Sequence, residues 1–171
     1  MSLDEFQPSL DAEARLLLLI EAFSRGNRVL EGRTKLAKLD FLIRYPSYFT
    51  RALQIRRPEL SGALEQSQPD LESRMVRYRY GPWDPAYFAV LGRLIGKGLV
   101  QPAPFNRGIG YRATNEGRAI AVAIGDEAAW RDTADRIKLL RRHFDLSGTN
   151  LKNFIYRHFP EVTRATWGES L

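Results

Sequence analysis

The chain has 171 residues, enough for one domain with its own core, and its 44% hydrophobic and 27% charged residues are typical of a soluble globular protein. The absence of cysteine excludes disulfides, thiol catalysis and thiolate metal sites, and the net charge of +6 favours an anionic partner. The longest apolar run is too short to span a bilayer and residues 1–10 lack a basic leader, so we expect a cytoplasmic protein without a membrane partner.

The positive charge is concentrated in the middle of the chain. Residues 25–112 carry sixteen basic and seven acidic groups, residues 1–24 carry one and five, and residues 113–171 carry nine and eight. Release of counterions makes a phosphate backbone a natural partner of a clustered basic face. Arginines on ordinary solvated helix faces would give the same count, so charge alone does not show that the partner is a nucleic acid.

Three helices are indicated in the first part of the chain. Residues 11–24 are so densely apolar that we expect a helix buried on more than one side. Residues 34–44 predict a helix that begins at a capping threonine, with Lys35 and Lys38 on faces away from its apolar stripe. In the stretch 47–68 a short helical piece is possible before Pro58.

The most informative stretch follows, over residues 74–98. Residues 74–80 alternate apolar and basic side chains, which predicts a strand with one wet face, and a Gly-Pro turn follows it. Asp84 and Pro85 are a strong helix start, and Gly98 is the matching stop. We expect this helix to bury Tyr87 or Phe88 with Leu91, Leu94 and Ile95, and to turn outward Ala86, Ala89, Arg93 and Lys97.

A two-stranded ribbon is predicted next, with strands over residues 99–105 and 111–113. Residues 106–110 supply the turn, and Arg107 places a cation at its tip. A helix followed by a ribbon with a basic tip is typical of a winged helix, a fold that most often binds double-stranded DNA.

The remaining sequence predicts helices. Thr114 caps one that runs to about residue 124, residues 127–144 form a second that includes Trp130, and a third runs from Ser147 to Pro160. The helix pair over residues 127–159 is available for dimerisation.

The predicted fold is therefore mainly α with a small β ribbon, a winged helix-turn-helix with extra C-terminal helices. We divide it into an arm (1–10), a winged-helix core (11–125), a helical extension of the same domain (126–160) and a tail (161–171). The residues expected to contact DNA are Arg93, Lys97, Arg107, Arg112, Arg77 and Arg79.

Motifs for catalysis are weak. The glycines of residues 108–110 lie in a hairpin rather than at a helix start, and no phosphate-binding glycine loop exists. His143 and His158 are near helix ends, where capping is the ordinary role, and Asp132 and Asp135 lie beside basic residues. We therefore expect no enzyme activity, no cofactor and no metal.

Two aromatic residues flank these elements in polar surroundings. Trp83 precedes the Asp84 start and is expected to act as a hydrophobic staple or core plug rather than as a platform for stacking bases. Trp167 lies in the polar tail, where it is a candidate anchor for a protein partner or a second copy of the chain.

Four short blocks resemble a known family. They are residues 34–46 (TKLAKLDFLIRYP), 78–84 (YRYGPWD), 110–117 (GYRATNEG) and 151–160 (LKNFIYRHFP). They are similar to the small winged-helix middle component of bacterial three-component ABC-ATPase conflict systems and, more loosely, to antitoxin-type winged-helix domains.

That resemblance implies a non-enzymatic role in defence against phage, with no catalytic residue. Two functions remain open. One is binding of double-stranded DNA. The other is a protein adaptor that joins an ABC-type ATPase to an effector without binding DNA itself.

Overall fold

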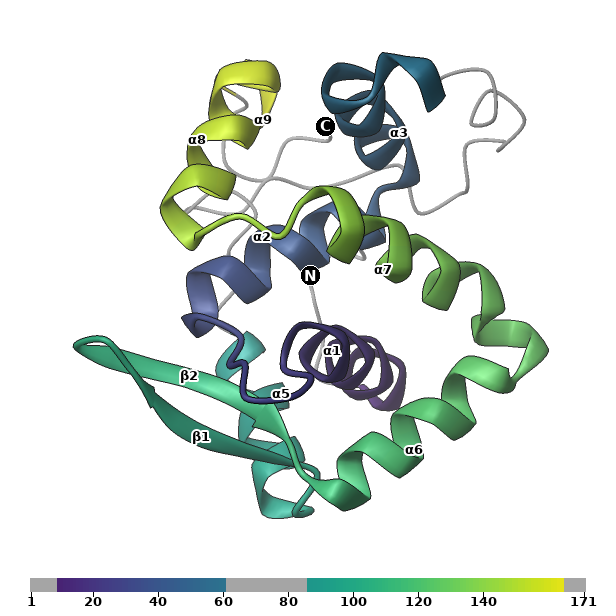
Figure 1. Cartoon of the computed structure of the whole chain (residues 1–171), viewed down its shortest axis with the longest axis vertical. Helices are drawn as coiled ribbons and strands as arrows, with labels where there is room; N and C mark the ends of the chain where they lie inside the picture. The colour runs from purple at the N-terminus through teal and green to yellow at the C-terminus, as the bar shows by residue number, and fades with distance from the viewer. Residues whose placement is uncertain (1–8, 61–85, 165–171) are drawn as a thin grey trace, which may run out of the picture.

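The computed structural model describes residues 9–60 and 86–164 and shows a mainly helical protein with one antiparallel ribbon (Figure 1). In chain order the elements are α1 (Leu10–Phe23), α2 (Gly32–Arg44), α3 (Pro46–Arg56), the 3-10 turn η1 (Pro58–Leu60), α5 (Ala86–Gly96), β1 (Val100–Phe105), β2 (Gly108–Ala113), α6 (Asn115–Asp126), the 3-10 turn η3 (Ala128–Trp130), α7 (Arg131–His143), α8 (Gly148–His158) and α9 (Pro160–Arg164).

Several predictions lie outside the described residues. These are the strand over 74–80 with Arg77 and Arg79, the staple Trp83, the helix start at Asp84 and Pro85, and the anchor Trp167. In the part of the chain that is described, no helix is both long and apolar enough to cross a membrane.

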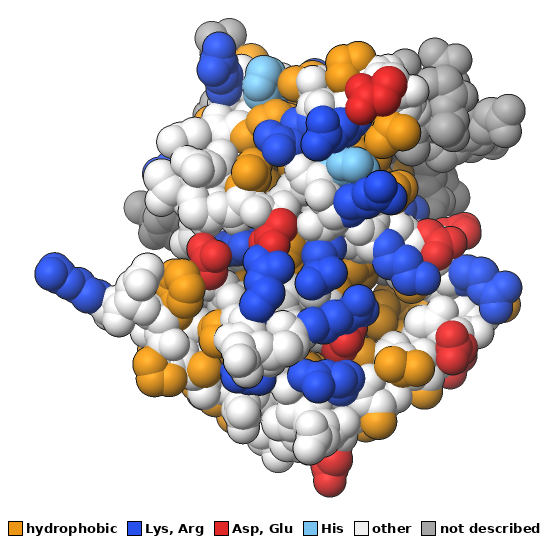
Figure 2. Space-filling model, viewed as in Figure 1, with side chains coloured by type: hydrophobic (Ala, Val, Ile, Leu, Met, Phe, Trp, Pro, Cys, Tyr) orange, Lys and Arg blue, Asp and Glu red, His pale blue; other side chains and the backbone are white. Residues whose placement is uncertain are grey.

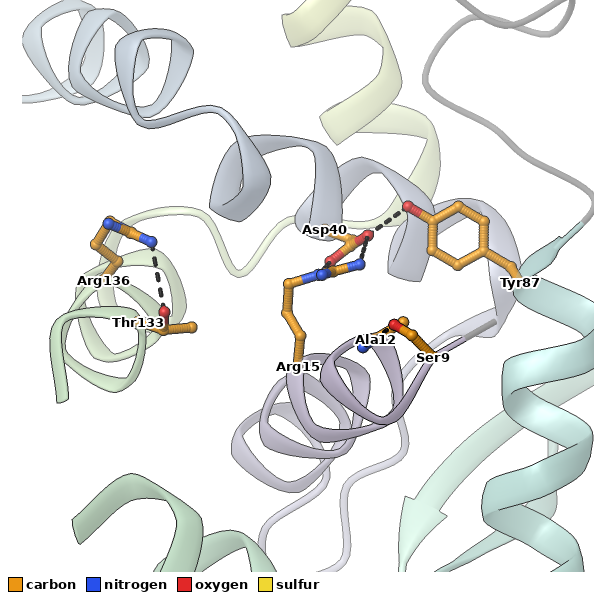
Figure 3. Close-up of polar contacts among 7 residues, drawn as sticks. All are labelled: Ser9, Ala12, Arg15, Asp40, Tyr87, Thr133 and Arg136. Atoms are coloured by element: carbon orange, nitrogen blue, oxygen red, sulfur yellow. Dashed lines mark hydrogen bonds and ion pairs between the residues drawn. The ribbon is translucent and has the colours of Figure 1, made fainter. Parts of the chain in front are cut away.

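Helix α1 is the centre of the fold. The Ser9 hydroxyl accepts a hydrogen bond from the Ala12 amide at 3.1 Å and so caps the helix (Figure 3). Almost every side chain from Leu16 to Phe23 is buried, because α2, α5, α6, α7 and β2 all pack around α1 (Figure 1). The expectation of a helix buried on more than one side is confirmed.

Helix α2 differs from its prediction in two ways. It begins at Gly32, two residues before the expected threonine cap. The two lysines that we expected on its other faces are buried, with Lys35 2% and Lys38 3% exposed. The reason is that α8, more than a hundred residues later in the chain, packs along the side of α2 that its own sequence marks as polar.

The ribbon is longer and its turn shorter than predicted. Its register pairs Val100 with Ala113 and Phe105 with Gly108, so only Asn106 and Arg107 form the turn. Asn106 has a positive φ of 50°, which asparagine tolerates better than most residues. An isolated bridge between Leu30 and Tyr111 fixes the ribbon to the loop between α1 and α2.

Contacts between the end of α5 and the start of α6 explain the roles of Thr114 and Gly117 in the sequence block 110–117. Gly98 has a φ of +74° and ends α5 as predicted, although the helix itself stops at Gly96. The Thr114 hydroxyl accepts from the Gly117 amide at 3.0 Å and donates to the Gly98 carbonyl at 2.6 Å. A Cβ on Gly117 would lie 1.9 Å from the Leu99 carbonyl oxygen, so this glycine allows α6 to sit directly against the end of α5.

The C-terminal helices complete the same core. The predicted helix over 127–144 is divided into η3 and α7, with Trp130 only half-buried at the junction. Pro160 starts the short helix α9 instead of ending the helical region. The apolar stripes of α7 and α8 belong to the same hydrophobic cluster as α1 and α2 in the described part of the chain, so their burial needs no second copy.

Candidate nucleic-acid interface

Arginines from five elements gather on one side of the molecule, where Figure 2 shows blue side chains crowded over the α1–α2 loop and the end of α7. We call this surface the cationic face. Contacts and shared grooves link its members, which are Arg25, Arg28, Arg56, Arg57, Arg112, Arg118, Arg141 and Arg142.

The lower part of the cationic face is built around the end of α1. Arg112 of β2 donates through Nη2 to the Gly26 carbonyl oxygen at 2.8 Å. Arg118, in the first turn of α6, lines the same shallow depression as Arg112 and Gly26. Arg25 and Arg141 line the adjoining groove between α1, α6 and α7. Residues almost 120 positions apart in the chain are therefore neighbours here.

The upper part is built around His143, the last residue of α7. Arg56 donates through Nε to the His143 carbonyl oxygen at 2.8 Å, and the Arg57 Nε lies 3.4 Å from the His143 Nδ1. Burial, followed by the charges of Arg57, Arg142 and Arg56, lowers the pKa of His143 below its usual value. Burial and the surrounding arginines therefore both favour the neutral form of this histidine.

Two carboxylates on this face are already paired. Burial raises the pKa of Asp145, but hydrogen bonds from Arg28 and Lys35 outweigh it, and the pKa of Asp145 lies below its usual value. Glu21 is held in a fork by Arg25, with contacts of 2.9 and 3.0 Å. Arg25 and Arg28 are therefore largely neutralised by these partners, and the net positive charge of the face comes mainly from its other arginines.

Three arginines of the face keep unused hydrogen-bonding capacity. Among the described residues, the buried Nε atoms of Arg112, Arg118 and Arg141 have no acceptor. A guanidinium group offers five donors in a fork that matches carboxylate and phosphate oxygens. Because these Nε atoms are themselves buried, a phosphate would have to bind the exposed part of each guanidinium group.

The sequence-predicted DNA residues are not all brought together. Arg112 belongs to the cationic face, and Arg107 is exposed at the tip of the ribbon. Arg93 is exposed on α5. Lys97 is half-exposed, but its Nζ lies 2.6 Å from the Glu13 Oε1, so it turns back onto α1 instead of standing outward as expected.

The positions of Lys97 and Arg112 along α1 show how far apart these groups are. Lys97 contacts Glu13 in the first turn of α1, whereas Arg112 contacts Gly26, just after the last turn. At about 1.5 Å per helical residue, Glu13 and Phe23 alone are separated by about 15 Å along the axis. Lys97 and Arg112 are therefore attached to opposite ends of the central helix.

The exposed side of α5 is mostly apolar or small. Phe88 is 51% exposed, Ile95 is exposed instead of buried as predicted, and Gly92 lies between them. The buried side consists of Tyr87, Val90, Leu91 and Leu94. Arg33 of α2 stacks on the Phe88 ring, 4.0 Å from its centroid. This surface is less suited to phosphate than the cationic face is.

A buried polar cluster holds α5 in place (Figure 3). Asp40 of α2 is completely buried and accepts from Arg15 of α1 at 2.5 and 3.3 Å. It also accepts from the Tyr87 hydroxyl of α5 at 2.5 Å. Burial and then the charge of Asp40 raise the pKa of Tyr87 well above its usual value, so the phenol stays protonated. The cluster therefore connects α1, α2 and α5 through buried hydrogen bonds.

Sequence reasoning missed most of the cationic face. Arg118 and Arg141 come from residues 113–171, whose nine basic and eight acidic groups nearly balance, so nothing in the sequence indicated that they would join a basic surface. Within the described ranges, no three histidine or acidic side chains are grouped closely enough to hold a metal ion. No protein-family model matches the chain, and no curated protein or solved structure is significantly similar to it.

Proposed function

We propose that the protein binds the sugar-phosphate backbone of double-stranded DNA through the cationic face, with Arg107 of the ribbon reaching a further phosphate. The observation that carries this proposal is the convergence of eight arginines from five segments of the chain on one side. Backbone contacts of this kind position a protein on DNA without reading its sequence.

The arrangement of the elements supports the same proposal. Helix α5 is followed directly by the ribbon, and the ribbon carries an exposed cation at its tip. This succession is the one expected of a winged helix. Within that proposal, α5 contributes Arg93, whereas the cationic face contributes most of the charge.

A salt titration of duplex binding tests the proposal. Fluorescence anisotropy of a labelled duplex of about 20 base pairs, at several salt concentrations, gives the dependence of affinity on ionic strength. The logarithm of the association constant should fall linearly with the logarithm of salt, by about 0.9 for each phosphate contacted. Failure to bind duplex at low salt would refute the proposal.

The adaptor function is the second candidate, and the exposed apolar side of α5 favours it. Phe88 and Ile95 lie on that side, and large exposed apolar residues are typical of protein contacts. The resemblance to the conflict-system family suggests an ABC-type ATPase as the partner and phage defence as the process. A stoichiometric complex with that ATPase that Phe88→Ser disrupts, together with no duplex binding by the isolated chain, would support this candidate instead.

A further inference from the structure

A groove between α1, α6 and α7 opens on the same side as the cationic face (Figure 2). Its volume is about 330 Å³. Pockets that bind small molecules span about 300 to 1,000 Å³, so this groove has room for one small ligand.

The floor and the rim of the groove differ in chemistry. The floor is formed by aliphatic side chains from all three helices, namely Leu18, Ala22, Ala121, Ala134 and Ile137, and the exposed Val122 also lines the groove. The rim carries Arg25, Lys138 and Arg141. Figure 2 shows orange side chains in a hollow with blue side chains along its edge. An apolar body and an anionic head would each find a matching surface.

The charged side chains of the rim differ in how strongly they pair with other groups of the protein. Arg25 is bound to Glu21, which also lines the groove, and Asp126 adds a second carboxylate at the edge. Lys138 is loosely paired, with its Nζ 3.9 Å from the Asp135 Oδ1. Among the described residues Arg141 forms no ion pair, unlike Arg25 and Lys138. Arg141 is therefore the rim residue whose charge is most available to an anion in the groove.

We propose that this groove binds a small amphipathic anion, with an aromatic or acyl body on the aliphatic floor and a carboxylate or sulfonate on Arg141 and Lys138. The anionic head distinguishes this ligand from a neutral apolar molecule, which would leave Arg141 unmatched. The small volume distinguishes it from a helix of a partner protein, which needs a longer groove.

The site also predicts regulation of DNA binding, and this part rests on the function proposed above. Arg25 and Arg141 belong to both the groove and the cationic face. A bound anion would occupy the Arg141 guanidinium and lower the local positive potential. Ligand and DNA should therefore compete.

A matched pair of fluorescent probes tests the site without DNA. The first is 8-anilinonaphthalene-1-sulfonate, and the second is N-phenyl-1-naphthylamine, which has the same rings without the sulfonate. Titrated into the full chain, the sulfonate should bind at one site and at least about tenfold more tightly than the neutral probe.

Three variants locate the binding. Arg141→Gln should weaken the sulfonate about tenfold and leave the neutral probe unchanged, whereas Arg157→Gln, an exposed cation of α8, should change neither. Ala134→Leu fills the floor and should abolish binding of both probes. If Ala134→Leu does not fold, Arg141→Gln still decides.

Two outcomes would overturn the proposal. They are equal affinity for the two probes, and no loss of sulfonate affinity in Arg141→Gln. Because the probes are titrated without DNA, failure of duplex binding leaves this result intact. Conversely, failure of probe binding does not touch the DNA proposal.

Discussion

The burial of Lys38 makes a quantitative prediction about stability. Its ammonium group is 3.2 Å from the Tyr156 hydroxyl, and among the described residues no carboxylate forms an ion pair with it. Burial, and then the charge of Lys152, lower the pKa of Lys38 from 10.5 to about 8. By contrast, the equally buried Lys35 is paired with Asp145 and Glu31.

The direction of the effect follows from proton binding. Below pH 8 the lysine is charged in both the folded and the unfolded state, and the folded state bears the full cost of burying the charge. Between about pH 8 and pH 10.5 the folded lysine is neutral while the unfolded lysine still holds its proton. Unfolding then requires proton uptake, so stability increases as the pH rises through this window.

The free energy of unfolding should differ measurably between pH 7 and about pH 9.5. With pKa values of about 8 and 10.5, this one residue adds about 2 kcal/mol to the free energy of unfolding between pH 7 and about pH 9.5. Stopping near pH 9.5 limits the opposing effect of Tyr48 and Tyr87, whose raised pKa values destabilise the folded state where unfolded tyrosines ionise.

Urea unfolding followed by circular dichroism measures this effect in the wild type and in Lys38→Met. The variant keeps all other titrating groups, so the wild type should gain about 2 kcal/mol relative to it between the two pH values. Lys152→Met, which removes an exposed lysine nearby, should keep most of the rise. If wild type and Lys38→Met show the same pH dependence, the burial of a charged Lys38 is refuted.

Two further predictions concern the architecture that positions the cationic face. Asp40→Asn leaves the Arg15 charge without its buried partner and should cost about 3 to 5 kcal/mol of unfolding free energy, whereas Asp135→Asn, from an exposed pair, should cost under about 1 kcal/mol. Gly117→Ala forces a Cβ against the Leu99 carbonyl and should lower the melting temperature markedly; Gly92→Ala, with open space around it, should raise stability by about 0.5 to 1 kcal/mol. Thermal and urea unfolding check both pairs, and equal effects within either pair would contradict the described packing.

Local signals in the sequence predicted local structure well. The glycine stop at Gly98, the threonine cap at Thr114 and the ribbon with Arg107 at its tip depend on neighbouring residues, and the structure contains all three. Such features are fixed by backbone conformation and by hydrogen bonds over a few positions.

The candidate site was harder to predict because it depends on contacts between distant segments. Lys35 and Lys38 counted toward the basic middle of the chain, yet packing of α8 against α2 removes both from the surface. Arg118 and Arg141 come from a segment with almost no net charge, and the fold brings them beside the end of α1. The spacing of apolar residues and the counts of charged residues do not show which distant segments come into contact.

The most direct test of the central claim is a comparison of two charge-matched double variants in duplex binding. Arg112→Gln with Arg141→Gln removes two charges from the cationic face, whereas Arg131→Gln with Arg157→Gln removes two exposed charges elsewhere. The first variant should bind a duplex about tenfold or more weakly than wild type and lose about two from the salt slope, and the second should keep wild-type affinity. Equal affinities for the two variants would contradict the assignment of this face to DNA.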